Sequence, residues 1–250
     1  MALTSILESF AAGLIAGFIC GLTGMGGGTI YVPVFYFMLG SIKKAIGTSL
    51  LVILVSSFSA LLSHMKAGQI NFRMTGFLII SGIIGAQYGS LITAKLPDIA
   101  VKIFFVCLTI FLSLNMWRER ARSDQDCSTQ IRSSPVNLTL IGFIGGLISG
   151  MGGVGGAIVL VPLLHLWIGL PIKICIGTTL SVVMFNSLSG VAGYICHGLV
   201  DFRVGVIAGF VAVFTAMAGS KISLRTDNRK LRKIFSVVLL LAGVGCHILV

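Results

Sequence analysis

Two glycine-rich stretches decide how this sequence folds: residues 23–28 read TGMGGG, and residues 149–156 read SGMGGVGG. Each stretch lies inside a long window that contains no Asp, Glu, Lys or Arg. The windows are Ser9–Ile42 and Ser133–Ile172, with 34 and 40 residues. A helix crosses the hydrocarbon core of a bilayer in about 20 residues, so both windows are too long for one straight crossing.

The segments that follow the glycines are short. Residues 29–39 and 157–168 contain 11 and 12 residues, and each segment carries a proline, Pro33 or Pro162. At about 1.5 Å per residue such a helix is less than about 20 Å long, which is too short to span a bilayer. Each window is therefore predicted to form a hairpin of a full helix, a glycine break and a half-helix.

The composition excludes a soluble globular or a disordered chain. Apolar residues make up 56% and charged residues 10%, whereas soluble domains average about 45–50% and about 25%. The mean hydropathy is +1.05. Six more charge-free windows have roughly the length of one crossing: Ala45–Met65, Met74–Ala94, Ile103–Trp117, Ile174–Val200, Val204–Ser220 and Ile234–Val250. We expect an all-α, polytopic membrane protein whose partner is the lipid bilayer.

The net charge of +11 does not indicate a nucleic-acid partner. The 18 Lys and Arg residues lie between the apolar windows, where basic residues orient a membrane protein.

The chain is an internal repeat. Residues 43–105 align without a gap to residues 173–235 at a constant offset of 130, with roughly a quarter of the positions identical. The glycine stretches also match once a few residues are inserted in the second copy. The sequence thus divides into a first membrane repeat (1–118), a charged cytoplasmic linker (119–135) and a second membrane repeat (136–250). Together they are expected to form one transporter domain.

The distribution of basic residues favours repeats of opposite topology. A hairpin that enters and returns contributes an even number of crossings, so a hairpin and three further helices give each half an odd number. The second half is therefore inverted relative to the first. This arrangement leaves 13 basic residues inside and 5 outside. A model in which each long window crosses once leaves 11 inside and 7 outside. Inverted repeats with broken helices are a common transporter plan, with the substrate site between the repeats.

The glycine breaks are candidate anion sites. Glycine lets a ligand approach the backbone, and a half-helix presents free N–H groups and the positive end of its dipole. Two such ends meeting at mid-membrane would bind an anion without Lys or Arg. The alternative is close helix packing through small residues, as in the Gly13, Gly17, Gly21 series.

Polar residues at matched positions of the two repeats are candidate side-chain donors to the anion. The alternative interpretation is that they cap helices or form hydrogen bonds between helices. The full candidate substrate-binding set is Gly24, Gly26, Gly27, Gly28, Thr48, Ser49, Gly150, Gly152, Gly153, Gly155, Gly156, Thr178, Thr179 and Asn186.

Other chemistries find little support. Residues 150–155 match GxGxxG, but the dinucleotide interpretation needs a preceding strand and an acid about 20 residues later, and no acid occurs between Asp126 and Asp201. No CxxC occurs, and the four histidines lack metal-ligand spacing, so no cofactor and no metal site are expected. The serines near glycine, Ser149 and Ser189, lack a GxSG context and no aspartate lies mid-span, so no enzymatic activity is expected. Arg73 and Arg203 are interpreted as interfacial anchors.

The glycine stretches resemble the sulfite exporter TauE/SafE family. So do residues 45–49 and 176–179, and the segments ending in Asn71-Phe72-Arg73 and Asp201-Phe202-Arg203. One departure is Val154, which interrupts the second glycine run. The resemblance implies a multi-pass transporter of the bacterial inner membrane that moves a small sulfur-containing anion, sulfite or an organosulfonate. It leaves open the exact anion, the direction, the coupling ion and whether the chain forms a homo-oligomer.

A second hypothesis is a non-transporting membrane module that assists the assembly of a partner complex. The linker 119–135 would be its docking surface.

Overall fold

The computed structural model describes residues 3–24, 26–107 and 134–227, and within these ranges the regular elements are all helical. The elements are α1 (Leu3–Thr23), α2 (Gly28–Leu39), α3 (Ile42–Lys66), α4 (Phe72–Lys95), α6 (Pro135–Gly152), α7 (Ala157–Pro162), the π-helix η1 (Leu163–Trp167), α8 (Ile172–Cys196) and α9 (Phe202–Arg225). Residues 98–107 are also helical. Most of the linker and the last window, Ile234–Val250, lie outside the described residues.

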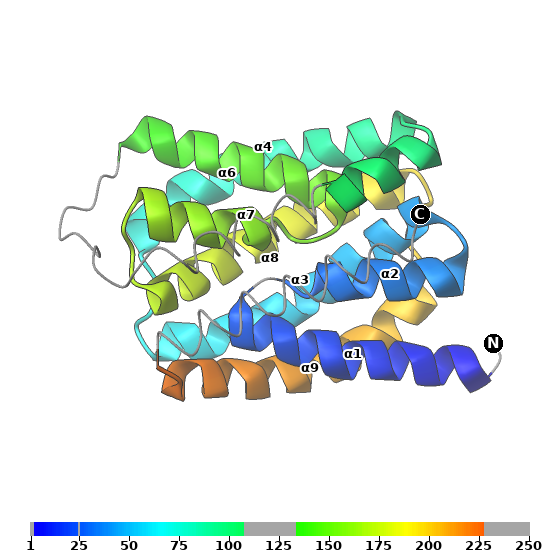
Figure 1. Ribbon diagram of the computed structural model, residues 1–250, viewed down its shortest axis with the longest axis horizontal. Coiled ribbons are helices and arrows are strands. Elements are labelled where there is room, and N and C mark those ends of the chain that lie inside the picture. Colours follow the sequence, from blue (N-terminus) through cyan, green and yellow to red (C-terminus); the bar gives the residue numbers. More distant parts are fainter. Residues whose placement is uncertain (1–2, 25, 108–133, 228–250) are drawn as a thin grey trace.

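Among the described residues, five helices are long and apolar enough to cross a membrane: α3, α4, α6, α8 and α9. The prediction of an all-α membrane protein is therefore confirmed. The helices lie along the long axis of the molecule (Figure 1). By their colours in Figure 1, α1 and α6 run in opposite directions, and so do α3 and α8.

Both glycine breaks form where they were expected. α1 ends at Thr23 and α2 begins at Gly28, while α6 ends at Gly152 and α7 begins at Ala157. Six glycines in the two breaks have φ between 65° and 77°, a region that costs other residues roughly 1–2 kcal/mol. They are Gly24, Gly26, Gly27, Gly153, Gly155 and Gly156.

The second half-helix departs from the expected regular helix over 157–168. It is α-helical only to Pro162 and continues as the π-helix η1. Proline has no N–H, and its ring crowds the carbonyl four residues earlier, so it weakens the α-helical hydrogen-bond ladder at Pro162. Pro33 is accommodated inside α2 without such a change.

The first helix of each half packs against a helix of the other half. α1 lies along α9 and α6 lies along α4 (Figure 1). The contacts are made by small residues: a Cβ on Gly13, Gly17 or Gly21 of α1 would collide with α9, and one on Gly142, Gly146 or Gly150 of α6 would collide with α4. Small-residue packing is thus confirmed for these helices, because it lets their backbones touch.

Two hydrogen bonds between the halves form an equivalent pair. Thr48 Oγ1 accepts a hydrogen bond from the Asp201 N–H at 2.9 Å, and Thr178 Oγ1 accepts one from the Asn71 N–H at 3.2 Å. Asn71 and Asp201 in turn cap α4 and α9, accepting from the N–H of Met74 and Val204. These bonds fix the start of each capped helix to the central helix of the opposite half.

Thr48→Val tests this link because it keeps the side-chain shape but removes the acceptor for the half-buried Asp201 N–H. We expect the free energy of unfolding to fall by about 1–2 kcal/mol, and Thr178→Val to act alike. Thermal unfolding in detergent measures the effect. Thr139→Val is the matched control, since Thr139 is exposed and bonds its own helix. Equal unfolding temperatures for Thr48→Val and Thr139→Val would contradict the prediction.

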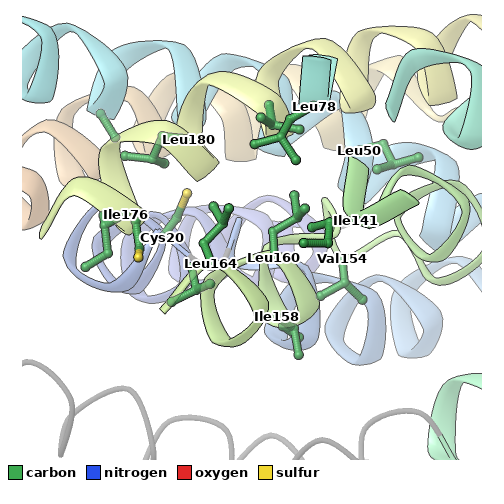
Figure 2. Close-up of a cluster of buried hydrophobic side chains, with 14 of the residues drawn as sticks. Cys20, Leu50, Leu78, Ile141, Val154, Ile158, Leu160, Leu164, Ile176 and Leu180 are labelled. Atoms are coloured by element: carbon green, nitrogen blue, oxygen red, sulfur yellow. The ribbon is translucent and has the colours of Figure 1, made fainter. Parts of the chain in front are cut away.

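The centre of the molecule is formed by α3 and α8. In each, 72% of the most apolar window is buried, against 39–44% in α4, α6 and α9. Figure 2 shows part of the core, in which side chains from α1, α3, α4, α6, α7, η1 and α8 gather in one cluster. The outer helices expose large apolar side chains such as Ile80, Phe210 and Phe214, as a helix surrounded by lipid does.

Candidate functional site

The two glycine breaks meet in the interior of the protein. A Cβ on Gly26 would lie 2.9 Å from the carbonyl oxygen of Val154. One on Gly28 would collide with Gly153 and Val154. All four of these residues are buried. Only glycine, which has no Cβ, allows the two breaks to approach this closely at positions 26 and 28. Gly26 is thus required for this contact as well as for its positive φ.

Each break is also held by the central helix of the other half. A Cβ on Gly24 would lie 2.8 Å from Ile176 of α8, and one on Gly153 would lie 2.9 Å from Ile46 of α3. Ile46 and Ile176 are equivalent residues at the repeat offset. The breaks are therefore packed between α3 and α8, away from the outer surface of the bundle.

A hydroxyl group reaches one break directly. Ser49 Oγ donates to the carbonyl oxygen of Gly153 at 2.6 Å, across the two halves. Its equivalent, Thr179, is fully buried, and its hydroxyl has no hydrogen-bond partner. Thr48 and Thr178 use their oxygens as acceptors for the capping loops described above, which leaves each hydroxyl proton free for another acceptor.

The buried amide of Asn186 is unpartnered at both its oxygen and its nitrogen. It packs on α4, where a Cβ on Gly82 would collide with its oxygen. Its equivalent in the first half, Ser56, lies 3.6 Å from the Cys20 sulfur atom.

The carbonyl of Ser149 accepts from the Gly153 N–H as that of Cys20 accepts from the Gly24 N–H. The Ser149 hydroxyl is buried and has no hydrogen-bond partner. The second half thus carries buried, unsatisfied polar groups, of which Ser149 lies beside its break: an added Cβ on Gly156 would lie 3.3 Å from the Ser149 Cβ.

The N-terminus of α2 lies at the meeting point of the breaks. Gly27 is its N-cap, with no side-chain capping bond, and its carbonyl accepts from the N–H groups of Ile30 and Tyr31. The first N–H groups of a helix have no partner within it, and they carry the positive end of the dipole. A small anion is the ligand that such an end favours.

Sequence reasoning named Asn186 and Thr179 as candidates, but its candidate set left out five further buried polar residues without hydrogen-bond partners among the described residues: Tyr31, His64, Ser149, Ser187 and Ser223. For Ser149 a signal existed, because it directly precedes the second glycine run as Thr23 precedes the first. Tyr31 and His64 gave no such signal, since aromatic and histidine side chains are as common at a membrane surface as inside.

The other histidines and arginines that the sequence analysis considered make ordinary contacts or are exposed. His165 Nδ1 lies 2.8 Å from the Leu170 carbonyl oxygen, and His197 Nδ1 lies 2.8 Å from that of Gly193. Arg73 and Arg203 are exposed at the starts of α4 and α9. Among the described residues no group of three His, Cys, Asp or Glu side chains is arranged to hold a metal ion. His247 lies outside the described residues.

Comparison with known proteins gives a consistent assignment. The family model "Sulfite exporter TauE/SafE" matches residues 9–246. The probable membrane transporter protein YunE of Bacillus subtilis is 26% identical over 95% of this chain and 94% of its own length. YdhB of the same organism, also named a probable membrane transporter protein, is 30% identical over 79% and 80%. A probable membrane transporter protein of Methanocaldococcus jannaschii is 24% identical over 93% and 91%. No solved structure matches significantly.

Proposed function

The chain belongs to the sulfite exporter TauE/SafE family, and on that premise we propose that it moves a small sulfur-containing anion, sulfite or an organosulfonate, across the bacterial inner membrane. The substrate binds where the two glycine breaks meet, and the two repeats have opposite topology. The opposite directions of α1 and α6 and of α3 and α8 support the inverted arrangement (Figure 1).

The observation that carries this proposal is the direct contact of Gly26 and Gly28 with the second break. Irregular backbone in a bilayer persists only where protein buries it or where it lines a polar cavity, since each unsatisfied group costs several kcal/mol in hydrocarbon. Two breaks brought together between α3 and α8 therefore concentrate backbone dipoles at one point. The helix end at Gly28 adds positive potential there, and oxyanion oxygens are the matching acceptors.

Side chains around the breaks complete the donor set. Thr179 and Asn186 have buried donors with no protein acceptor, and a bound oxyanion would satisfy both. Ser49 ties the second break to α3, so it would hold the backbone in position for the ligand. Acidic side chains, which would repel an anion, are absent from α2, α3, α7 and α8.

Reconstitution into liposomes tests the proposed function. Saturable exchange is measured for sulfite, sulfoacetate and methanesulfonate, with sulfate and taurine alongside. Exchange of one sulfur anion supports the proposal. If none of these anions is exchanged, with or without a proton or sodium gradient, the transport proposal is contradicted and the partner-module hypothesis is favoured. That hypothesis predicts that replacing the linker 119–135 with a neutral spacer abolishes the assembly of the partner complex.

Replacing Asn186 with leucine is expected to weaken anion binding without lowering the stability of the protein. An unpaired buried amide costs about 1–3 kcal/mol, so an apolar side chain of similar size should leave the unfolding temperature unchanged or raise it. Flux of the transported anion should fall by about tenfold through the loss of one hydrogen bond to a charged ligand. Asn137→Leu makes the same change at an exposed position of α6. Equal flux in the two variants would remove Asn186 from the site.

A further inference from the structure

Three buried polar side chains of the second half correspond to three of the first half, and the two sets differ in their hydrogen bonds. The exposed fraction of all six side chains is 0%. Two of the pairs are related by the repeat offset of 130, and in the third pair each residue lies four positions before the glycine that follows its helix. The pairs, with the residue of the second half first, are Thr179 and Ser49, Asn186 and Ser56, and Ser149 and Cys20.

In the first half this set is bonded within the protein. Ser49 Oγ donates to the carbonyl oxygen of Gly153 at 2.6 Å. Ser56 Oγ lies 3.2 Å from the Ile53 carbonyl oxygen and 3.6 Å from the Cys20 sulfur atom, and either can accept its proton. The hydroxyl protons of the first half therefore have acceptors and leave a ligand little to bind.

In the second half the same positions carry free donors. The hydroxyls of Ser149 and Thr179 and both polar atoms of the Asn186 amide have no hydrogen-bond partner among the described residues. Each hydroxyl can donate one proton, and the amide nitrogen can donate two. Such groups are costly to leave unpaired in a bilayer. The repeat gives both halves the same arrangement of helices, so packing alone would treat the two sets alike. A set that is free in one half only indicates an occupant with acceptor atoms there.

Ser149 and Asn186 lie where α6, α4 and α8 meet. A Cβ on Gly82 of α4 would lie 3.1 Å from the amide carbon of Asn186, and a Cβ on Gly146 of α6 would collide with the Gly82 carbonyl. The Gly82 backbone thus contacts both neighbours, and Ser149 follows Gly146 by one turn of α6. Ser149 also borders the second break, since a Cβ on Gly156 would lie 3.3 Å from its own Cβ.

The first half shows the corresponding contact closed. There α1 packs on α9 as α6 packs on α4, and the counterparts of Ser149 and Asn186, which are Cys20 and Ser56, touch at 3.6 Å. A hydroxyl and an amide can bond each other, because each is both a donor and an acceptor. Ser149 and Asn186 nevertheless make no such bond in the structure. A ligand that accepts from both would take the place of the missing contact.

Thr179 is presented to the breaks from α8. It lies one turn after Ile176 and one turn before Val183. Both of these neighbours pack on the breaks, since a Cβ on Gly24 would lie 2.8 Å from Ile176 and one on Gly155 would lie 2.8 Å from Val183. Residues three and four apart share one face of a helix, so the Thr179 hydroxyl lies on the face of α8 that contacts both breaks.

We propose that the oxygen atoms of the transported anion are bound by the second half alone, and that Ser149 is a substrate-binding residue beside Thr179 and Asn186. The inference rests on the proposed transport function. Three donor side chains match the three oxygen atoms that sulfite or a sulfonate group carries on one side of its sulfur atom. The other side, with the lone pair of sulfite or the carbon of a sulfonate, faces the first half, whose hydroxyls are already bonded. The anion is therefore held in one orientation.

Two matched serine substitutions test which half binds the anion, with methanesulfonate exchange in liposomes as the assay. Ser149→Ala removes a donor that has no partner in the protein. The half-saturating concentration of methanesulfonate should therefore rise about tenfold, and the unfolding temperature without ligand should not fall. Ser56→Ala makes the same change at a buried serine of the first half that does have partners. This control should unfold at a lower temperature and keep the half-saturating concentration of the wild type.

An unchanged half-saturating concentration in Ser149→Ala, or an equal rise in both variants, would overturn the inference and leave the transport proposal standing. If the wild type exchanges no anion, the transport proposal fails, and binding is then measured by the unfolding temperature in detergent with and without methanesulfonate. A ligand that binds the folded state raises this temperature. A rise in the wild type and in Ser56→Ala but not in Ser149→Ala would support the site. The same rise in all three proteins, or none in the wild type, would overturn it.

Discussion

Leucine at Gly153 is expected to abolish anion flux while the protein still inserts into the membrane. Gly153 has φ of 65°, and an added Cβ would lie 2.9 Å from Ile46 and from Ser49 Oγ. Leucine would therefore push the second break away from α3, break the bond from Ser49 and separate the two breaks. Gly27→Leu should do the same from the first half, because its Cβ would lie 2.7 Å from the Ala16 carbonyl.

Gly198→Leu is the control for this prediction. Gly198 has nearly the same φ, 66°, but nothing lies within 4 Å of an added Cβ. Both substitutions carry the same backbone strain of roughly 1–2 kcal/mol, so any difference between them comes from the packing of the break. Gly153→Ala serves as a milder second variant if leucine prevents folding. Flux in liposomes and elution as a single species in detergent are the two measurements, and normal flux in both Gly153 variants would rule out the paired breaks as the site.

Leucine at Gly17 is expected to cause the largest loss of stability, about 3 kcal/mol or more. An added Cβ there would lie 2.7 Å from the Ala212 Cα and would collide with the Thr215 hydroxyl. The contact is between two helix backbones, which cannot move apart without losing the whole α1–α9 interface. Thr215 would also lose its bond to the Gly13 carbonyl, 3.1 Å long.

Gly76→Leu provides the comparison, because Gly76 is exposed on α4 and an added Cβ meets nothing within 4 Å. Leucine favours a helix over glycine by up to about 1 kcal/mol, so this variant should unfold at the same temperature as the wild type or slightly higher. The midpoint of thermal unfolding in detergent checks both. If Gly17→Leu unfolds at the same temperature as Gly76→Leu, the α1–α9 interface does not stabilise the association of the two halves.

Much of the candidate site could be predicted from single residues and their spacing. The positions of the breaks followed from glycine runs inside windows too long for one helix. Asn186 stood out because an amide in an apolar window needs a partner. The bond between Ser49 and Gly153 could not be predicted, because its partners are 104 residues apart and nothing in the spacing relates one to the other. The change to a π-helix after Pro162 was also missed, since Pro33 in the equivalent half-helix causes none.

The sequence by itself determined the helices, the two breaks and the twofold repetition, because apolar window length, glycine φ freedom and residue identity are local properties. Only the tertiary structure decided which helices pair. α1, α4, α6 and α9 all carry small residues that allow close packing, and in lipid there is no hydrophobic drive to choose among such faces. The choice rests on how backbones fit. That fit places α1 on α9 and α6 on α4, brings the two breaks into contact, and leaves Ser149 and Asn186 unbonded within the described chain, where their equivalents Cys20 and Ser56 touch.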